Sequence, residues 1–108
     1  MADTNARPDA LPDERKARLG RIVFRAWRRG FREADLVLGP FAEQAGPGLD
    51  ERDLTDFETL LTQDDDHRLY AWIIGTEPTP AEYETPVMAR VRAFMAEHVA
   101  AEVARGAG

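Results

Sequence analysis

Apolar residues recur at spacings of three and four along most of this chain, which is the spacing of one face of an α-helix. The first stripe lies within residues 12–29 and consists of Leu19, Ile22, Val23, Ala26 and Trp27. The second lies within residues 31–44 and consists of Ala34, Val37, Leu38, Phe41 and Ala42. The third lies within residues 50–62 and consists of Leu54, Phe57, Leu60 and Leu61. The pattern predicts three helices in the first 62 residues.

Glycine and proline residues mark where these helices should end. Gly30 follows an arginine-rich turn and is expected to end or bend the first helix. Gly39 and Pro40 fall inside the second helix and predict a kink or a break, because proline lacks the backbone donor and clashes with the preceding turn. The run Ala45-Gly46-Pro47-Gly48 predicts a turn, after which Asp50 is placed to cap the third helix.

The second half of the chain predicts two more helices. A short apolar helix is expected over residues 69–74, stopped by Gly75. Thr79-Pro80-Ala81-Glu82 has the spacing of a capping box, and Thr85-Pro86 offers a second helix start, so we expect a short turn and then a long helix from about Pro86. The inward stripe of this helix is predicted to be Val87, Val91, Phe94, Met95 and His98.

No segment alternates with the period of a strand, and no internal repeat is visible. We therefore predict an all-α, single-domain bundle of about five helices over residues 13–104. Residues 1–12 are expected to form a disordered tail and residues 105–108 a frayed one.

Composition narrows the function classes. The chain has 108 residues, enough for one core, and no apolar run reaches the length of about eighteen residues that a membrane span requires. Cysteine and serine are absent, which excludes disulfides, thiolate metal sites and serine or cysteine nucleophiles. No nucleophile–base set can be assembled, so a small hydrolase is disfavoured. The N-terminus resembles neither a signal nor a transit peptide, and we expect a cytoplasmic protein.

Charge is unevenly distributed along the chain. The net charge is −6, yet eight basic residues lie in the stretch from Glu14 to Arg32. They are Arg15, Lys16, Arg18, Arg21, Arg25, Arg28, Arg29 and Arg32. Such a segment either neutralises its own domain or faces an acidic partner. A nucleic-acid-binding or regulatory helical module is the alternative, although domains that bind nucleic acid are usually basic overall.

The stretch from Arg28 to Asp35 is the candidate site. It combines three arginines, one glycine, one aromatic residue and two carboxylates. A glycine among strong helix formers costs roughly 0.5–1 kcal/mol, which indicates a left-handed turn or the close approach of another backbone or ligand. Arg29 and Glu33 would share one helix face, either as a simple surface ion pair or as part of a docking surface.

Two further features each allow two interpretations. Asp64-Asp65-Asp66-His67 could bind a metal ion, but the alternating ligands of a calcium loop are missing, and acids that cap a helix start are favoured. In the segment Leu69-Tyr70-Ala71-Trp72-Ile73-Ile74, Trp72 is predicted to lie in the core, whereas an exposed Tyr70 would belong to the docking face.

Taken together, these residues resemble the SdhE/Sdh5 family of succinate dehydrogenase assembly factors (assembly factor 2), which promote flavinylation. The family's Arg-Gly-x-x-Glu motif is matched by Arg29-Gly30-Phe31-Arg32-Glu33. Gly39-Pro40-Phe41, the acidic turn, Leu69-Tyr70-Ala71-Trp72 and Pro80 follow in the family's order, so the resemblance covers about residues 19–95. Two positions depart from it: Ala34 replaces a larger apolar residue, and Asp65-Asp66-His67 replaces Asp-Pro-Asp.

The resemblance implies a five-helix protein of the bacterial cytoplasm that is not itself an enzyme and is a monomer when free. It implies a partner, the flavoprotein subunit of succinate dehydrogenase and by extension that of fumarate reductase, and no nucleic acid or membrane. It also implies no cofactor of the protein's own, since the FAD is held by the partner. The partner-binding residues it implies are Arg29, Gly30, Phe31, Arg32, Glu33 and Asp35.

Overall fold

The computed structural model describes residues 12–106, and side chains from Asp13 to His98. Five α-helices follow one another in this part of the chain, and none of it is strand, so the all-α prediction is confirmed. The helices are α1 (Pro12–Trp27), α2 (Arg32–Ala45), α3 (Glu51–Leu61), α4 (Asp66–Ile74) and α5 (Pro86–Gly106). Two 3-10 turns, η1 (Gly46–Gly48) and η2 (Ala81–Tyr83), lie between them. No described helix is long and apolar enough to cross a bilayer.

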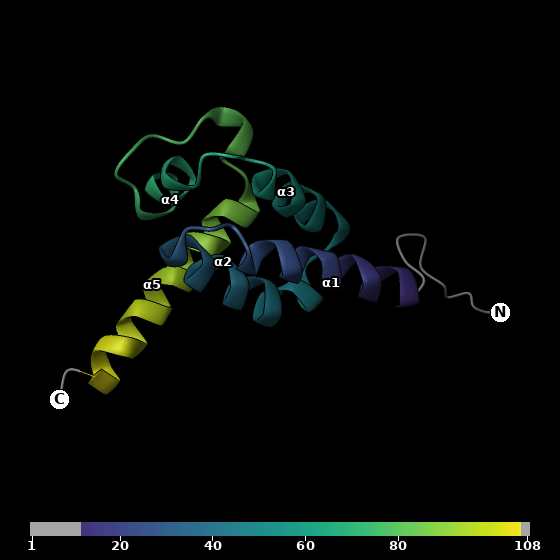
Figure 1. Ribbon diagram of the computed structural model, residues 1–108, viewed down its shortest axis with the longest axis horizontal. Coiled ribbons are helices and arrows are strands. Elements are labelled where there is room, and N and C mark those ends of the chain that lie inside the picture. The colour runs from purple at the N-terminus through teal and green to yellow at the C-terminus, as the bar shows by residue number, and fades with distance from the viewer. Residues whose placement is uncertain (1–11, 107–108) are drawn as a thin grey trace.

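The helices pack around a single core, and the C-terminal end of α5 projects beyond it (Figure 1). The five residues predicted for the inner face of α2 are all buried, as are the four predicted for α3. Phe41 lies at the centre, with its ring centroid 5.3 Å from that of Phe57 and 5.7 Å from that of Phe94. Helices α2, α3 and α5 therefore meet at one aromatic cluster, which ties the hairpin of α1 and α2 to the rest of the molecule.

The predicted caps at Asp50 and Thr85 are confirmed. The side chain of Asp50 accepts a hydrogen bond from the backbone nitrogen of Asp53, and Thr85 Oγ1 accepts one from that of Met88. The predicted capping box at Thr79 is wrong, because Thr79 Oγ1 accepts a hydrogen bond from Arg92 Nη2 at 2.6 Å instead. Residues 81–83 consequently form only the short turn η2, and α5 begins at Pro86 as expected.

The described bounds differ from the predicted ones at α4, which begins at Asp66 and not at residue 69, and at both ends of the chain. Helix α1 ends at Trp27, two residues earlier than expected, and α5 continues to Gly106, past the predicted frayed end. The predicted disordered tail lies outside the described residues apart from Pro12, which begins α1, and residues 107–108 also lie outside them.

Gly39 and Pro40 do not break α2, which runs without interruption from Arg32 to Ala45, so the prediction of a break is wrong. The reason lies in α1. The ring of Trp27 packs directly over Gly39, where a Cβ atom would overlap it. Trp27 Nε1 also donates a hydrogen bond of 2.8 Å to Glu43 Oε2, one turn beyond Gly39. The glycine serves the close approach of the two helices, and the tryptophan bridges the turn that the proline weakens.

We predict that Gly39→Ala lowers the free energy of unfolding by about 2 kcal/mol, because the added methyl group forces the Trp27 ring away from α2. Urea denaturation monitored by tryptophan fluorescence measures the change. Gly20→Ala is the matched control: nothing lies within 4 Å of a Cβ at Gly20, so this variant should gain roughly 0.5–1 kcal/mol through helix propensity. Equal stability of the two variants would contradict the packing argument.

Helix α1 is joined to α3 by a second set of contacts, centred on Arg18. Its Nε and Nη2 donate to Glu58 Oε2 and Oε1 at 3.1 and 2.8 Å, and its Nη1 donates to Glu51 Oε1 at 2.6 Å. The hydrogen bonds from Arg18 lower the pKa of the Glu58 carboxyl, and burial opposes this effect only in part. Part of the basic segment therefore neutralises the domain's own acids.

This pair predicts how stability depends on pH. Folding lowers the pKa of Glu58, so its carboxylate stabilises the folded state. This stabilisation is complete above the ordinary pKa of 4.5 and is lost as the pH falls through the lower pKa of the folded state. Unfolding free energies measured between about pH 5.5 and 3 should fall less steeply for Glu58→Gln than for the wild type. Parallel curves for the two proteins would show that the pair contributes nothing to acid sensitivity.

Candidate functional site

The candidate site is the loop that joins α1 to α2, residues 28–31. Gly30 adopts the left-handed conformation with φ of +90°, which side chains other than glycine's adopt only with strain. The residue is exposed, and no atom lies within 4 Å of the position a Cβ would occupy. The predicted left-handed turn is thus present, and it leaves a stretch of bare backbone open to the surface.

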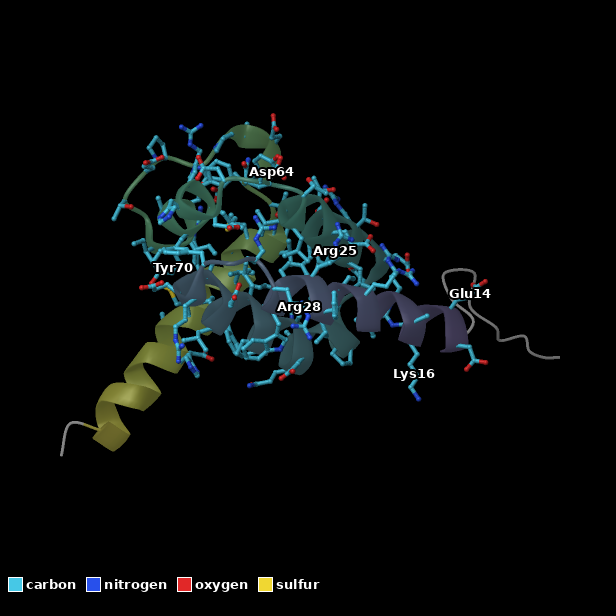
Figure 2. All side chains as sticks on the ribbon, viewed as in Figure 1. Glu14, Lys16, Arg25, Arg28, Asp64 and Tyr70 are labelled. Atoms are coloured by element: carbon cyan, nitrogen blue, oxygen red, sulfur yellow. The ribbon has the colours of Figure 1, made fainter. Side chains whose placement is uncertain are left out.

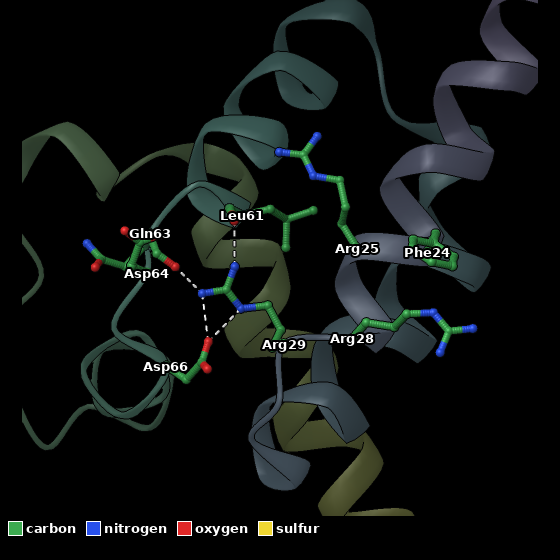
Figure 3. A pocket seen from close by; sticks show the side chains of 8 residues that line it. All are labelled: Phe24, Arg25, Arg28, Arg29, Leu61, Gln63, Asp64 and Asp66. Carbon is green, nitrogen blue, oxygen red and sulfur yellow. Dashed lines mark hydrogen bonds and ion pairs between the residues drawn. The ribbon is translucent and has the colours of Figure 1, made fainter.

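Arg29 turns away from this surface and into the molecule (Figure 3). Its Nε donates a hydrogen bond of 2.8 Å to Asp66 Oδ1 at the start of α4. Its Nη1 and Nη2 donate to the backbone oxygens of Leu61 and Gln63, at the end of α3 and in the following link. Only 8% of the side chain is exposed. The guanidinium group therefore fastens the loop to the α3–α4 link and satisfies a carbonyl oxygen that the helix end leaves unpaired.

The prediction that Arg29 and Glu33 share one helix face is wrong. The i,i+4 relation holds only along a continuous helix, and the left-handed turn at Gly30 rotates the chain between the two residues. Glu33 is exposed in the first turn of α2, where its charge complements the helix dipole. Neither the surface ion pair nor a joint contact surface of these two residues therefore exists.

The six predicted partner-binding residues divide into two groups. Arg29 and Asp35 hold the loop: Asp35 Oδ1 accepts a hydrogen bond of 3.0 Å from the backbone nitrogen of Arg29. The remaining four reach the surface, with Gly30, Arg32 and Glu33 exposed and Phe31 partly buried. The structure thus brings the motif together as a short exposed segment on an internal support, and only part of it is available for contact.

Phe31 lies against two aromatic side chains of α4. Its ring centroid is 4.2 Å from that of His67 and 5.6 Å from that of Tyr70, the second in an edge-on arrangement. Tyr70 is half-buried, and it contributes one edge to this surface, while Trp72 lies in the core with 2% exposed. The prediction for Trp72 is confirmed. His67 was not predicted as part of the site, although its position in the acidic turn was the available signal.

The acidic turn before α4 has two structural roles. Asp65 accepts a hydrogen bond of 3.0 Å from the backbone nitrogen of Arg68, which confirms the predicted cap. Asp66 pairs with Arg29, a role that the sequence did not reveal. No group of three or more potential metal ligands gathers among the described side chains. Through Asp66, the acidic turn supports the α1–α2 loop from inside the protein.

A shallow cleft of about 270 Å³ lies where the end of α1 faces the α3–α4 link (Figure 3). Arg25, Arg28 and Asp64 line it on different elements and belong to the same region of the surface (Figure 2). The cleft presents mainly charged side chains, and none of its lining residues forms a nucleophile–base pair. Such a surface is suited to binding another macromolecule.

We predict that Arg29→Ala lowers the free energy of unfolding by about 3 kcal/mol, because it leaves Asp66 and two backbone oxygens without their donor. Arg28→Ala is the matched control, since the neighbouring arginine is exposed and should change stability by less than about 0.5 kcal/mol. Denaturant midpoints of both variants measure the difference. A midpoint for Arg29→Ala equal to that of the wild type would contradict the inward geometry.

Comparison with known proteins places the chain among assembly factors. The family model described as "Flavinator of succinate dehydrogenase" matches residues 20–95. The FAD assembly factor SdhE of Acetobacter pasteurianus is 37% identical over 79 residues, which cover 73% of this chain and 72% of that protein. The mitochondrial succinate dehydrogenase assembly factor 2-A of Drosophila mojavensis is 34% identical over 83 residues, covering 76% and 51%.

A third relative, the mitochondrial assembly factor 2 of Dictyostelium discoideum, is 35% identical over 72 residues, covering 67% of this chain and 50% of the relative. The chain thus spans about half the length of these mitochondrial proteins and nearly three quarters of the bacterial one. The matched residues include the second half of α1, the loop at Gly30, all of α2 and the start of α4 with Asp66.

Proposed function

Because this chain belongs to the Sdh5 family of succinate dehydrogenase flavinators, we propose that it is an assembly factor for the succinate dehydrogenase flavoprotein. In this proposal it binds the flavoprotein subunit and promotes the covalent attachment of FAD to it. The same surface would serve the flavoprotein subunit of fumarate reductase. The protein makes no bond itself and carries no FAD of its own, since the cofactor belongs to the partner.

The observation that carries the proposal is the exposed backbone at Gly30, held in place from inside by Arg29. Gly30 has φ of +90° and no atom within 4 Å of the position that a Cβ would occupy, so another chain can approach its peptide groups closely. The internal hydrogen bonds of Arg29 fix this loop before a partner arrives, which reduces the entropy lost on binding.

The surface residues beside Gly30 supply the polar and apolar parts of the contact. Arg32 and Glu33 are exposed and can form charge-assisted hydrogen bonds with a partner. Phe31 and Tyr70 offer aromatic edges next to them. Arg29 and Asp35 are positioning residues in this view, because both are engaged in holding the loop.

A small binding protein can promote flavinylation by orientation. If it holds a mobile part of the flavoprotein, the reacting group of that protein and the flavin spend more time in a productive arrangement. The rate of the intramolecular step between them then rises. The chemistry belongs to the flavin and its host. Orientation of this kind needs a rigid surface, and the hydrogen bonds of Arg29 support a rigid loop.

The contacts of the basic segment argue against the alternative function of binding nucleic acid. Three of its eight basic residues, Arg15, Arg18 and Arg29, are engaged in ion pairs or hydrogen bonds within the protein. A nucleic-acid interface depends on cations available to phosphates. The remaining basic side chains belong to a chain with a net charge of −6, which would repel a polyanion.

We predict that Glu33→Gln abolishes most of the gain in covalent flavin while leaving the fold intact, because Glu33 is exposed and has no partner among the described residues. The measurement is in-gel flavin fluorescence of the denatured flavoprotein subunit, produced with and without this protein. Glu97→Gln, an exposed position on α5, is the control and should behave as the wild type.

Gly30→Arg is a harsher test of the same surface. It should also abolish the gain in covalent flavin, and its strain in the left-handed conformation should cost about 1–2 kcal/mol of stability. A melting curve must accompany this variant to separate lost binding from lost folding. Normal covalent flavin in a strain that depends on Glu33→Gln or Gly30→Arg protein would refute the proposed site.

A further inference from the structure

The exposed side of α1 adjoins the cleft of the candidate site, since Phe24, Arg25 and Arg28 line both, and it has features that packing within the chain does not explain. Its residues recur at spacings of three and four and so share one side of the helix. They are Ala17, Gly20, Arg21, Phe24, Arg25 and Arg28, which we call the Phe24 surface. Two adjoining shallow hollows lie on it, and Gly20 and Phe24 line both.

Phe24 is the most exposed large apolar side chain described, with 57% of its surface accessible. The guanidinium carbon of Arg28 lies 4.3 Å from the centroid of its ring. A single exposed phenylalanine is ordinary on a protein surface. The neighbouring glycine makes this one different.

Gly20 lies inside α1, where glycine is less favourable than alanine by roughly 0.5–1 kcal/mol. Unlike Gly39, it accommodates no side chain, because nothing lies within 4 Å of the position of its absent Cβ. Unlike Gly30, it has no positive φ. The chain's own packing therefore gives no reason for it. Its effect is to keep a hollow open beside the Phe24 ring.

Arginines border this hollow. Arg21, Arg25 and Arg28 are exposed, and none forms an ion pair with a described carboxylate. Arg21 and Arg25 lower the pKa of Glu58 only through charge at a distance, with Arg18 the main cause. Arg21 and Arg25 lie about 6 Å apart along the helix, at 1.5 Å per residue, and Arg28 follows directly after its last residue. Positive charge thus surrounds an apolar centre.

We propose that the Phe24 surface binds an acidic polypeptide segment of the flavoprotein client, with one apolar side chain of that segment seated over Gly20 against Phe24. This inference rests on the proposed function for the identity of the client. The chemistry of the segment follows from complementarity: two or three carboxylates meet Arg21, Arg25 and Arg28, while the apolar side chain fills the hollow. Because Arg28 belongs to the loop that carries Gly30, one client can cover both surfaces.

An acidic segment fits better than nucleic acid. The cations surround an apolar strip, which a phosphate backbone would leave unfilled. A peptide can match both features at once.

Two variants test the proposal in the full-length protein, by titration against the purified flavoprotein subunit at several salt concentrations. Arg21→Gln/Arg25→Gln should weaken binding about tenfold at low salt and flatten its salt dependence. The matched control, Arg52→Gln/Arg90→Gln, removes the same charge from other helices and should bind as the wild type. Gly20→Leu should also weaken binding about tenfold while its melting temperature is unchanged or raised, with Gly20→Ala as the smaller control.

The outcomes separate this inference from the proposed function. If the wild type raises covalent flavin and Glu33→Gln does not, but Arg21→Gln/Arg25→Gln and Gly20→Leu bind the subunit normally, the Phe24 surface is refuted and the function stands. If the wild type neither binds the subunit nor raises covalent flavin, both are refuted. Loss of binding to a single-stranded oligonucleotide in the arginine variant, with client binding unchanged, would overturn the proposal in favour of nucleic acid.

Discussion

The hydrogen bonds of Arg29 determine the shape of the candidate site. One guanidinium group connects three segments that are distant in sequence: the α1–α2 loop, the end of α3 and the start of α4. Its planar fork matches this task, since it can donate to a carboxylate and to two carbonyl oxygens at once, which a lysine cannot do. Only 8% of the side chain is exposed, so these bonds act in an environment where an unmatched partner is costly.

This arrangement explains why an arginine and a glycine stand side by side in the loop. The side chain of Arg29 points into the protein. The positive φ of Gly30 then turns the chain back toward the surface. As a result, Arg32 and Glu33 begin α2 at the surface, while Arg29, on the other side of the glycine, is anchored in the interior. A loop fixed in this way presents its backbone without first having to be ordered, so binding costs less conformational entropy.

Much of the fold followed from the sequence, because helix periodicity and caps are local properties. The five helices, the inner face of α2, the cap at Asp50 and the stop at Gly75 were all predicted. The errors concern contacts between distant segments. Gly39 signalled a break locally but serves the Trp27 ring of another helix. The role of Arg29 likewise depended on Asp66, which lies 37 residues away and could not be assigned by spacing.

The number of charges in the basic segment does not determine which of them bind within the protein and which remain available to a partner. The sequence left open whether these residues neutralise their own domain or face a partner, and the structure shows that different members have different positions. Arg15 and Arg18 face α3, and Arg29 faces the α3–α4 link. Arg21, Arg25 and Arg28 remain on the outer side of α1, next to an exposed ring and a glycine that the fold does not require. Since a helix places residues on different sides according to its 3.6-residue period, one arginine-rich segment can stabilise the bundle with one face and still offer charge to a partner with the other.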